Sequence, residues 1–156
     1  MAIETERKYL VDASAWKKLK KLKGTLYKQS YIVSTDDCTL RLRLIEKKAY
    51  LTVKGKAKGM SRPEFEYEIP AKDAKDMLKT MGTGGTEKVR FKIRYKGNLW
   101  EVDVFRGDNK GLIVAEIELK HEFQQFEKPD WVREEVTDDL RYANASLAKH
   151  PFKDWK

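Results

Sequence analysis

The sequence of 156 residues has little of what several protein classes require. It has one cysteine, Cys38, which cannot form an internal disulfide, and two histidines, His121 and His150, which are too few and badly spaced for a zinc site. The longest uninterrupted apolar stretch, 111–115, is far shorter than the roughly 20 residues that cross a bilayer. The first residues are charged where a signal peptide would be apolar. These absences argue against a disulfide-bonded secreted domain and against a helical membrane protein, and they predict a cytoplasmic location.

Two common catalytic motifs are also missing. There is no G-x-x-x-x-G-K loop, because the glycine-containing segment 82–85 follows an apolar helical stripe and is typical of a helix end and a turn. Cys38 has no evident His or Asn partner for nucleophilic catalysis. The sequence therefore favours neither a P-loop nucleotidase nor a cysteine hydrolase.

Charge, by contrast, is abundant. The chain has 33 Lys and Arg residues and 25 Asp and Glu residues, with a formal net charge of +8. Hydrophobic residues make up 40% and aromatic residues 11% of the chain, which is enough to fill a core. The length suits one compact domain, and no repeat or linker divides it, so we expect a single domain over 1–156. The positive charge suits a polyanionic ligand, either nucleic acid or a smaller polyphosphate.

Eight segments alternate apolar and polar side chains with a period of two, which is typical of strands with two different faces. They begin near residues 4, 28, 39, 50, 62, 88, 100 and 115. A solvated charged face is the ordinary explanation for any single strand. Several such faces together would leave a very large wet surface with edges prone to aggregation. A closed sheet of eight strands has no open edges and encloses room for one small ligand.

Helical spacing predicts elements between and after these strands. The expected helices are 13–22, capped by Asp12; 70–81, opened by Pro70; a C-terminal helix from Thr137 or Asp138 to about Lys149; and a short helix at 121–128. Because the apolar stripes of the helices need a partner, we expect the apolar strand faces to point outward beneath them. The charged faces then line the interior. The predicted fold is α+β but mainly β: an eight-stranded antiparallel closed β-barrel tunnel with helices packed on the outside.

The interior of such a barrel would hold charges of both signs. Buried charges are stable only when they are paired or bound to ions. The carboxylates fall into two groups, Glu4 with Glu6 and Glu116 with Glu118, among many Lys and Arg residues. Such a lumen suits divalent cations together with a compact polyanion.

The segment 4–8 reads E-T-E-R-K and has the form E-x-E-x-K, and on this motif the chain resembles the CYTH superfamily, the triphosphate tunnel metalloenzymes. Further segments resemble the same family in order, over nearly the whole chain. They are Arg41-Leu42-Arg43, 51–54 with Lys54, 62–69 with Glu64 and Glu66, 87–90, 102–105 with Asp103, 116–118 and the closing segment 134–142. The chain is short and has no element for a base or a thiazole, so within the family it is similar to the small bacterial inorganic triphosphatases.

The resemblance implies metal-dependent chemistry on a triphosphate group, with Mg²⁺ or Mn²⁺ as the cofactor and a small-molecule triphosphate as the partner. The expected metal ligands are Glu4, Glu6, Asp103, Glu116 and Glu118. The expected substrate-binding residues are Lys8, Arg41, Arg43, Lys54, Glu64, Lys88 and Arg90. The expected catalytic residues are Glu66, which would position the attacking water, together with Lys8 and Tyr31.

Several alternatives stay open on the sequence alone. The substrate can be inorganic triphosphate, thiamine triphosphate, a nucleoside triphosphate or an RNA 5′-triphosphate, and the family includes class IV adenylate cyclases. A polyphosphate-binding protein without turnover also fits, as does a nucleic-acid-binding barrel that stacks bases on aromatic side chains. Nucleic acid is disfavoured because carboxylates in a binding groove repel phosphate. Glu66 can instead be a salt-bridge partner of the arginines. The number of metal ions and the oligomeric state, a homodimer included, stay open.

Overall fold

The structure, a computed structural model, describes residues 2–20 and 23–155 of the chain. The strands in this part are β1 (Ile3–Val11), β2 (Thr25–Ser34), β3 (Cys38–Ile45), β4 (Lys48–Gly55), β5 (Ser61–Ile69), β6 (Thr83–Tyr95), β7 (Asn98–Phe105), β8 (Ile113–Glu118) and β9 (Val132–Glu135). The helices are α1 (Ala13–Lys18), α2 (Ala71–Met81) and α3 (Asn144–Lys149), with short 3-10 helices at Gly107–Asn109, Leu140–Tyr142 and Phe152–Asp154.

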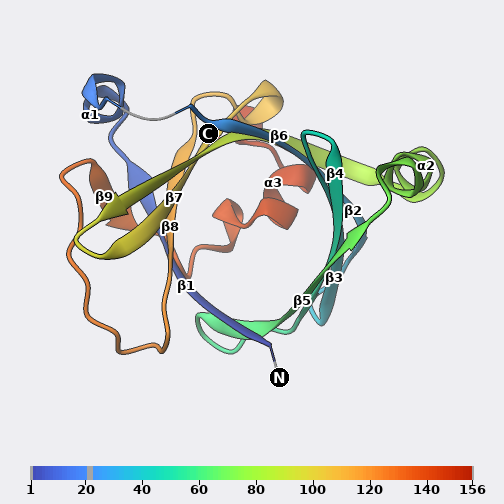
Figure 1. Cartoon of the computed structure of the whole chain (residues 1–156), viewed down its shortest axis with the longest axis horizontal. Helices are drawn as coiled ribbons and strands as arrows, with labels where there is room; N and C mark the ends of the chain where they lie inside the picture. Colours follow the sequence, from blue (N-terminus) through green and yellow to red (C-terminus); the bar gives the residue numbers. More distant parts are fainter. Residues whose placement is uncertain (1, 21–22, 156) are drawn as a thin grey trace.

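The strands β1 to β8 form a closed antiparallel barrel (Figure 1). Around the ring they follow the order β1, β8, β7, β6, β2, β3, β4 and β5, and β5 closes the ring by pairing Pro63 with Ile3 at the start of β1. The short strand β9 pairs with the end of β1, beyond the residues that pair with β5. Closure removes the edges that an open sheet would expose. The predicted eight-stranded antiparallel barrel is confirmed.

Apolar side chains cover the outer face of the barrel. One buried cluster lies beneath α1 and β9, where Trp16 of α1 packs edge-on against Phe91 of β6 and against Trp131. Another lies beneath α2, where the fully buried Ala74 meets Leu42 of β3. The aliphatic and aromatic faces of the strands therefore point outward, which leaves the charged faces inside, as the sequence predicts.

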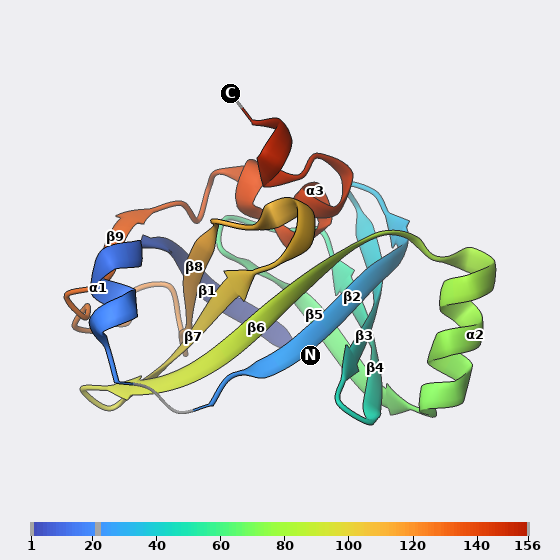
Figure 2. The same cartoon turned by 90° about the horizontal axis from the view of Figure 1, so that it is seen from above.

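The helix α3 lies differently from α1 and α2. It contacts β6 and β2 and covers one end of the ring (Figure 2). Gly84 at the start of β6 permits this approach, since its φ is +51° and a Cβ there would lie 3.0 Å from the carbonyl oxygen of Ala148. Behind α3, the buried residues Leu147 and Phe105 share a cluster with Phe152 and Trp155 of the C-terminal segment. The barrel is thus covered at the end where α3 lies.

The helix α2 has nearly the predicted bounds, whereas α1 is shorter than predicted. The α2 helix confirms the prediction, with Pro70 as its N-cap residue and Gly82 as its C-cap residue. The predicted 13–22 helix is too long, because α1 ends at Lys18 and Leu19 is already extended; Leu22 lies outside the described residues. Lys17, Lys18 and Lys20 follow Trp16 in the sequence, and repulsion among their charges favours an early end.

Two further helix predictions are wrong. The predicted C-terminal helix is interrupted, because Asp139 caps the 3-10 helix Leu140–Tyr142 and Ala143 is extended before α3 begins. The segment 121–128 forms turns and loop rather than a helix. Its Phe126 packs edge-on against Tyr9 and Trp100, so burial of this ring fixes the loop without helical hydrogen bonds. Among the described residues, no helix has the length and apolar character needed to span a membrane.

Candidate active site

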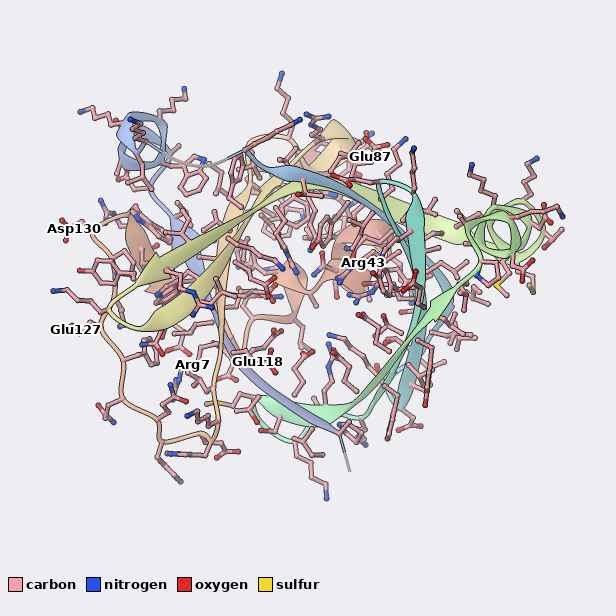
Figure 3. The ribbon with its side chains drawn as sticks, viewed as in Figure 1. Arg7, Arg43, Glu87, Glu118, Glu127 and Asp130 are labelled. Carbon is pink, nitrogen blue, oxygen red and sulfur yellow. The ribbon has the colours of Figure 1, made fainter. Side chains whose placement is uncertain are left out.

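A cavity of about 420 Å³ occupies the interior of the barrel. All the predicted site residues except Lys88 and Asp103 line it, and the segment Ala143, Asn144 and Ala145 lines it at the covered end. Figure 3 shows Arg43 and Glu118 inside the ring, whereas Arg7 and Glu127 lie outside it.

Carboxylates dominate one wall of the cavity, on β1 and β8. Glu6 lies directly opposite Glu118 in the register of these two strands, and Lys8 lies opposite Glu116. Like charges at directly paired positions repel each other. Burial, followed by the charge of Glu4, raises the pKa of Glu118. The negative charge of the carboxylates on β1 and β8 therefore exceeds the positive charge that these two strands supply to the cavity.

Glu6 and Glu116 form the deepest part of the acidic wall. Burial raises the pKa of Glu6 well above its ordinary value, and the charges of Glu116 and Glu4 raise it further. Burial also opposes ionisation of Glu116, but attraction to Lys8 and Arg90 outweighs it and holds the pKa of Glu116 well below its ordinary value. Without a cation, Glu6 therefore holds its proton more tightly than an ordinary carboxyl group, and Glu116 holds its proton less tightly.

Arginines dominate the wall built by β6, β2 and β3. The strand β3 lies opposite β8 in the ring. The guanidinium carbons of Arg43 and Arg90 lie 5.1 and 5.0 Å from the ring centroid of Tyr27. Burial, together with the charges of Arg41 and Arg90, lowers the pKa of Arg43 to about 10. The Nε atom of Arg41 is buried and has no hydrogen-bond acceptor among the described residues. This wall holds positive charge and a free donor, which suits an anionic ligand.

A lysine joins the acidic wall to β4 and β5. The Nζ atom of Lys54 donates to Glu4 at 3.1 Å and lies 3.0 Å from Glu64 Oε2. Burial raises the pKa of Glu4, and so does a hydrogen bond with Glu64. Lys8 is held in a similar way at the covered end, where its Nζ atom donates to the carbonyl oxygen of Tyr142 at 3.2 Å and lies 3.8 Å from Glu116. Both lysines face the cavity with carboxylates beside them.

Glu66 lies near the arginines of β3. Its Oε2 atom accepts a hydrogen bond of 2.8 Å from Thr52 Oγ1 and lies 3.8 Å from Arg41 and 4.0 Å from Arg43. Thr52 in turn accepts from Arg41 at 3.3 Å. The contacts to the arginines are long, so the carboxylate is held chiefly by the threonine and keeps acceptor capacity toward the cavity.

Two predicted site residues lie behind the cavity wall. Lys88 and Asp103 are 0% and 1% exposed, and Lys88 Nζ donates to Asp103 Oδ2 at 2.6 Å. Both carboxylate oxygens of Asp103 also accept from Arg90. The structure therefore pairs Asp103 with two cations instead of with the other carboxylates, and neither Asp103 nor Lys88 lines the cavity.

Comparison with known proteins places this barrel in a family. The model of the CYTH domain matches residues 2–152. The chain belongs to the CYTH domain family. An inorganic triphosphatase of Acetivibrio thermocellus is 46% identical over the whole chain and 99% of its own length. An inorganic triphosphatase of Nitrosomonas europaea is 35% identical over 93% of this chain and 96% of its own.

Solved structures share the fold. The crystal structure of the inorganic triphosphatase NE1496 matches with a TM-score of 0.67 and 32% identity, over 95% of each chain. A conserved hypothetical protein of Pyrococcus furiosus matches with a TM-score of 0.60 and 20% identity, over 77% of this chain and 80% of its own, and this likeness concerns the fold alone. Metal dependence is general among CYTH triphosphatases.

The donor set of this CYTH barrel suits a hard divalent cation, although the site is not preassembled. Among residues 2–20 and 23–155, no three His, Cys, Asp or Glu side chains converge closely enough to hold a metal ion. Carboxylate oxygens are nevertheless the ligands that Mg²⁺ and Mn²⁺ prefer. A cation among Glu4, Glu6, Glu116 and Glu118 would offset the charges by which carboxylates of this wall raise the pKa of Glu6 and of Glu118, beyond the effect of burial. The carboxylates of β1 and β8 are therefore chemically suited to bind Mg²⁺ or Mn²⁺.

Sequence reasoning missed several polar residues of this CYTH site. Gln29, Thr52 and Thr86 make buried or half-buried hydrogen bonds to one another or to the arginines, and Asn144 joins them from α3. The alternation pattern could have identified Thr52, which shares a face with Lys54, and Gln29, which shares a face with Tyr31. No sequence pattern could have identified Asn144, because its place depends on how the C-terminal segment crosses the barrel.

Proposed function

We propose that this chain hydrolyses inorganic triphosphate to pyrophosphate and phosphate, in a metal-dependent reaction inside the barrel. One observation carries the proposal: a cavity of about 420 Å³ inside the closed barrel has clustered carboxylates on one wall and arginines on the wall across from it. A compact polyanion that arrives with divalent cations would satisfy both walls at once. The named inorganic triphosphatases among the relatives support the choice of substrate.

The phosphate oxygens would bind the basic wall. Arg41 and Arg43 offer planar donors that match phosphate oxygens two at a time. Arg90, whose Nε and Nη2 atoms donate to Asp103, contributes its charge and the remaining N–H groups, and Lys54 and Lys8 act as point charges. Lys88 and Asp103 differ from the other proposed residues, because both are buried behind the wall. We therefore assign to them the support of Arg90, and not contact with phosphate or metal.

The metal ion would bind the acidic wall. We propose Glu4, Glu6, Glu116 and Glu118 as its ligands, with Mg²⁺ or Mn²⁺ as the ion. When bound, the ion supplies positive charge that neutralises phosphate oxygens and assists the attacking water. Glu4 would exchange its contact with Lys54 for the ion, which leaves Lys54 paired with Glu64 and with a donor available to the substrate.

The reaction needs an oriented water molecule. The water oxygen bonds to the terminal phosphorus, the bond from that phosphorus to the bridging oxygen breaks, and pyrophosphate leaves with the electron pair and takes up the proton that the water loses. Glu66 is our choice to accept a hydrogen bond from this water, because Thr52 holds its carboxylate beside Arg41. Tyr31 and Lys8 line the same cavity and would assist by hydrogen bonds to phosphate oxygens or to the leaving group.

The assay that tests this function is phosphate release from tripolyphosphate, ATP and thiamine triphosphate, each with Mg²⁺, Mn²⁺ or EDTA. We expect tripolyphosphate to be the fastest, because the cavity has few apolar groups that would favour binding of a base or a thiazole. EDTA should abolish release. Cyclic AMP and pyrophosphate from ATP would instead identify a cyclase, and tight binding of tripolyphosphate without turnover would identify a polyphosphate-binding protein.

Two further features remain predictions. A location in the cytoplasm and an organisation as one domain over residues 1–156 each rest on the sequence, and the oligomeric state, a homodimer included, stays open. Nucleic acid is disfavoured as a partner, because the carboxylates of β1 and β8 face the cavity and would repel the phosphates of a DNA or RNA strand. Gel filtration with light scattering decides the oligomeric state, and a steep salt dependence of RNA binding would revive the nucleic-acid alternative.

A further inference from the structure

Two uncharged amides connect the basic wall to the helix that covers the barrel. Gln29 of β2 is 4% exposed, and its Oε1 atom accepts from Arg43 Nε at 3.0 Å. Its Nε2 atom donates to Asn144 Oδ1 at 3.0 Å and to Thr86 Oγ1 at 3.2 Å. Asn144 Oδ1 also accepts from Lys88 Nζ at 3.2 Å. A continuous hydrogen-bonded chain therefore runs from Arg43 through Gln29 and Asn144 to Lys88.

The charges at the two ends fix the orientation of both amides. Arginine and lysine side chains can only donate hydrogen bonds. Arg43 therefore requires the oxygen of Gln29 on its side, which turns the Gln29 amino group toward Asn144. Lys88 requires the oxygen of Asn144, and that same oxygen receives the Gln29 amino group. Rotating either amide by half a turn would place donor against donor, so the chain has one consistent arrangement.

An uncharged acceptor suits this position better than a carboxylate. Arg43 has Arg41 and Arg90 as repelling neighbours, and its Nη1 atom is 4.0 Å from Glu66. Gln29 holds the Nε edge of the guanidinium and leaves both terminal nitrogens for a ligand. A carboxylate at residue 29 would hold the same edge but would also neutralise the charge that attracts phosphate. The amide thus orients the cation without lowering its attraction for an anion.

We propose that Gln29 and Asn144 are positioning residues that fix the direction in which Arg43 meets the triphosphate. This inference rests on the proposed function, because it concerns the substrate of the same cavity. Asn144 supports Gln29 from the first turn of α3, and Lys88 secures Asn144 in turn. The covering helix therefore contributes to the substrate site through Gln29, without a charged group of its own.

The primary test is Gln29→Leu, which keeps the bulk of the side chain and removes its hydrogen bonds with Arg43, Asn144 and Thr86. We expect KM for tripolyphosphate to rise about tenfold with kcat changed less, because an unheld Arg43 weakens binding in the ground state and the transition state alike. Asn144→Leu should raise KM by a smaller factor, because Gln29 keeps its contact with Thr86. Asn144→Asp, which keeps the acceptor oxygen, should lie closer to wild type. Gln29→Glu should also raise KM, because its charge neutralises Arg43.

A matched control separates positioning from stability. Asn109 is a buried asparagine that anchors the C-terminal segment, through Oδ1 to the backbone N–H of Phe152 at 2.8 Å, and it lies outside the cavity. Asn109→Ala should lower the Tm and leave KM unchanged. In an Arg43→Ala background, Gln29→Leu should have little further effect, because a residue that acts through Arg43 is not additive with it.

Each outcome decides one claim. Wild-type KM in Gln29→Leu, or full additivity with Arg43→Ala, overturns the positioning role and leaves the proposed function intact. If the wild-type protein leaves tripolyphosphate unchanged, the proposed function fails. The exchange rate of the Arg43 Nε–H proton, measured by NMR in wild type and in both leucine variants, then decides the orienting contact alone. Equal rates overturn it, and faster exchange in the variants supports it.

Discussion

Asp103 holds Arg90 by two parallel hydrogen bonds, 2.7 Å from Nε to Oδ1 and 2.8 Å from Nη2 to Oδ2. The same carboxylate accepts from Lys88 at 2.6 Å. This geometry is that of a rigid bidentate ion pair, and it fixes Arg90 on the wall from behind. It also explains why Asp103 lies apart from the carboxylates of β1 and β8, although it shares a strand face with Glu101, which lines the cavity.

We therefore predict that Asp103→Asn destabilises the metal-free protein by about 3–5 kcal/mol, the usual cost of removing one partner from a buried ion pair. Burial already lowers the pKa of Lys88 to about 7, so Lys88 can lose its proton when its partner is gone. Arg90 cannot, and its charge is left buried without compensation. Urea denaturation in EDTA measures the loss. A variant as stable as wild type would show that Asp103 does not stabilise the fold as an ion-pair partner of Arg90 and Lys88. Asp103 would then again be a candidate metal ligand.

Glu118→Gln should behave in the opposite way. Burial and the charges of Glu4, Glu101 and Glu116 raise the pKa of Glu118, so removing its charge relieves repulsion, and the metal-free protein should be as stable as wild type or slightly more so. Turnover of tripolyphosphate should fall steeply, because a proposed metal ligand is lost. Thermal melts with and without Mn²⁺, beside the phosphate assay, measure both effects. A much lower Tm without metal, or wild-type turnover, would contradict the assignment.

The period of two predicts the face of a strand but not the depth of a residue in the barrel. On β6, the residues Lys88, Arg90, Lys92 and Arg94 share one face in the sequence. In the structure Lys88 is fully buried at the covered end, Arg90 is nearly buried on the wall, and Lys92 is exposed while still lining the cavity. Depth depends on where the strand crosses its neighbours, and the alternation carries no information about that.

The covering helix shows a second limit. The apolar spacing of the C-terminal segment predicts helix, and α3 does form, but the extended residue Ala143 interrupts it. That interruption directs Tyr142 and Asn144 toward Lys8 and Lys88. Contacts between residues more than 50 positions apart determine this geometry, so local sequence patterns predict the helix and miss its part in the site.

Arg43→Ala should lower kcat/KM for tripolyphosphate roughly 10- to 150-fold, because a charge-assisted contact to phosphate is lost. This decrease corresponds to a loss of about 1.5–3 kcal/mol of transition-state stabilisation. The control is Arg94→Ala on the same face of β6, whose side chain is exposed and does not line the cavity. That variant should keep wild-type kinetics. Steady-state phosphate release at several ionic strengths measures both. Equal losses in the two variants would indicate a diffuse electrostatic effect and would remove Arg43 from the site.

The raised pKa of Glu6 predicts how pH affects stability and cation binding. Burial, with the charges of Glu116 and Glu4, raises this pKa in the folded protein above the ordinary 4.5. A carboxyl group whose pKa is raised on folding binds its proton more tightly in the folded state, so its contribution to stability is fully present below the unfolded pKa. That contribution is lost as pH rises through the folded pKa. The metal-free Tm should therefore fall with rising pH in that window.

A divalent cation competes with the proton at Glu6, so the increase in Tm on adding Mg²⁺ or Mn²⁺ should grow as the pH rises through the same window. Melts between about pH 5 and pH 8, with EDTA or with saturating cation, measure both trends. In Glu6→Gln the group no longer titrates, so the metal-free Tm should lose this part of its pH dependence. The cation should also stabilise that variant less. Two results would each show that Glu6 does not belong to the proposed metal site. One is a metal-free Tm with the same pH dependence in wild type and Glu6→Gln, and the other is an increase in Tm with cation that is the same at every pH.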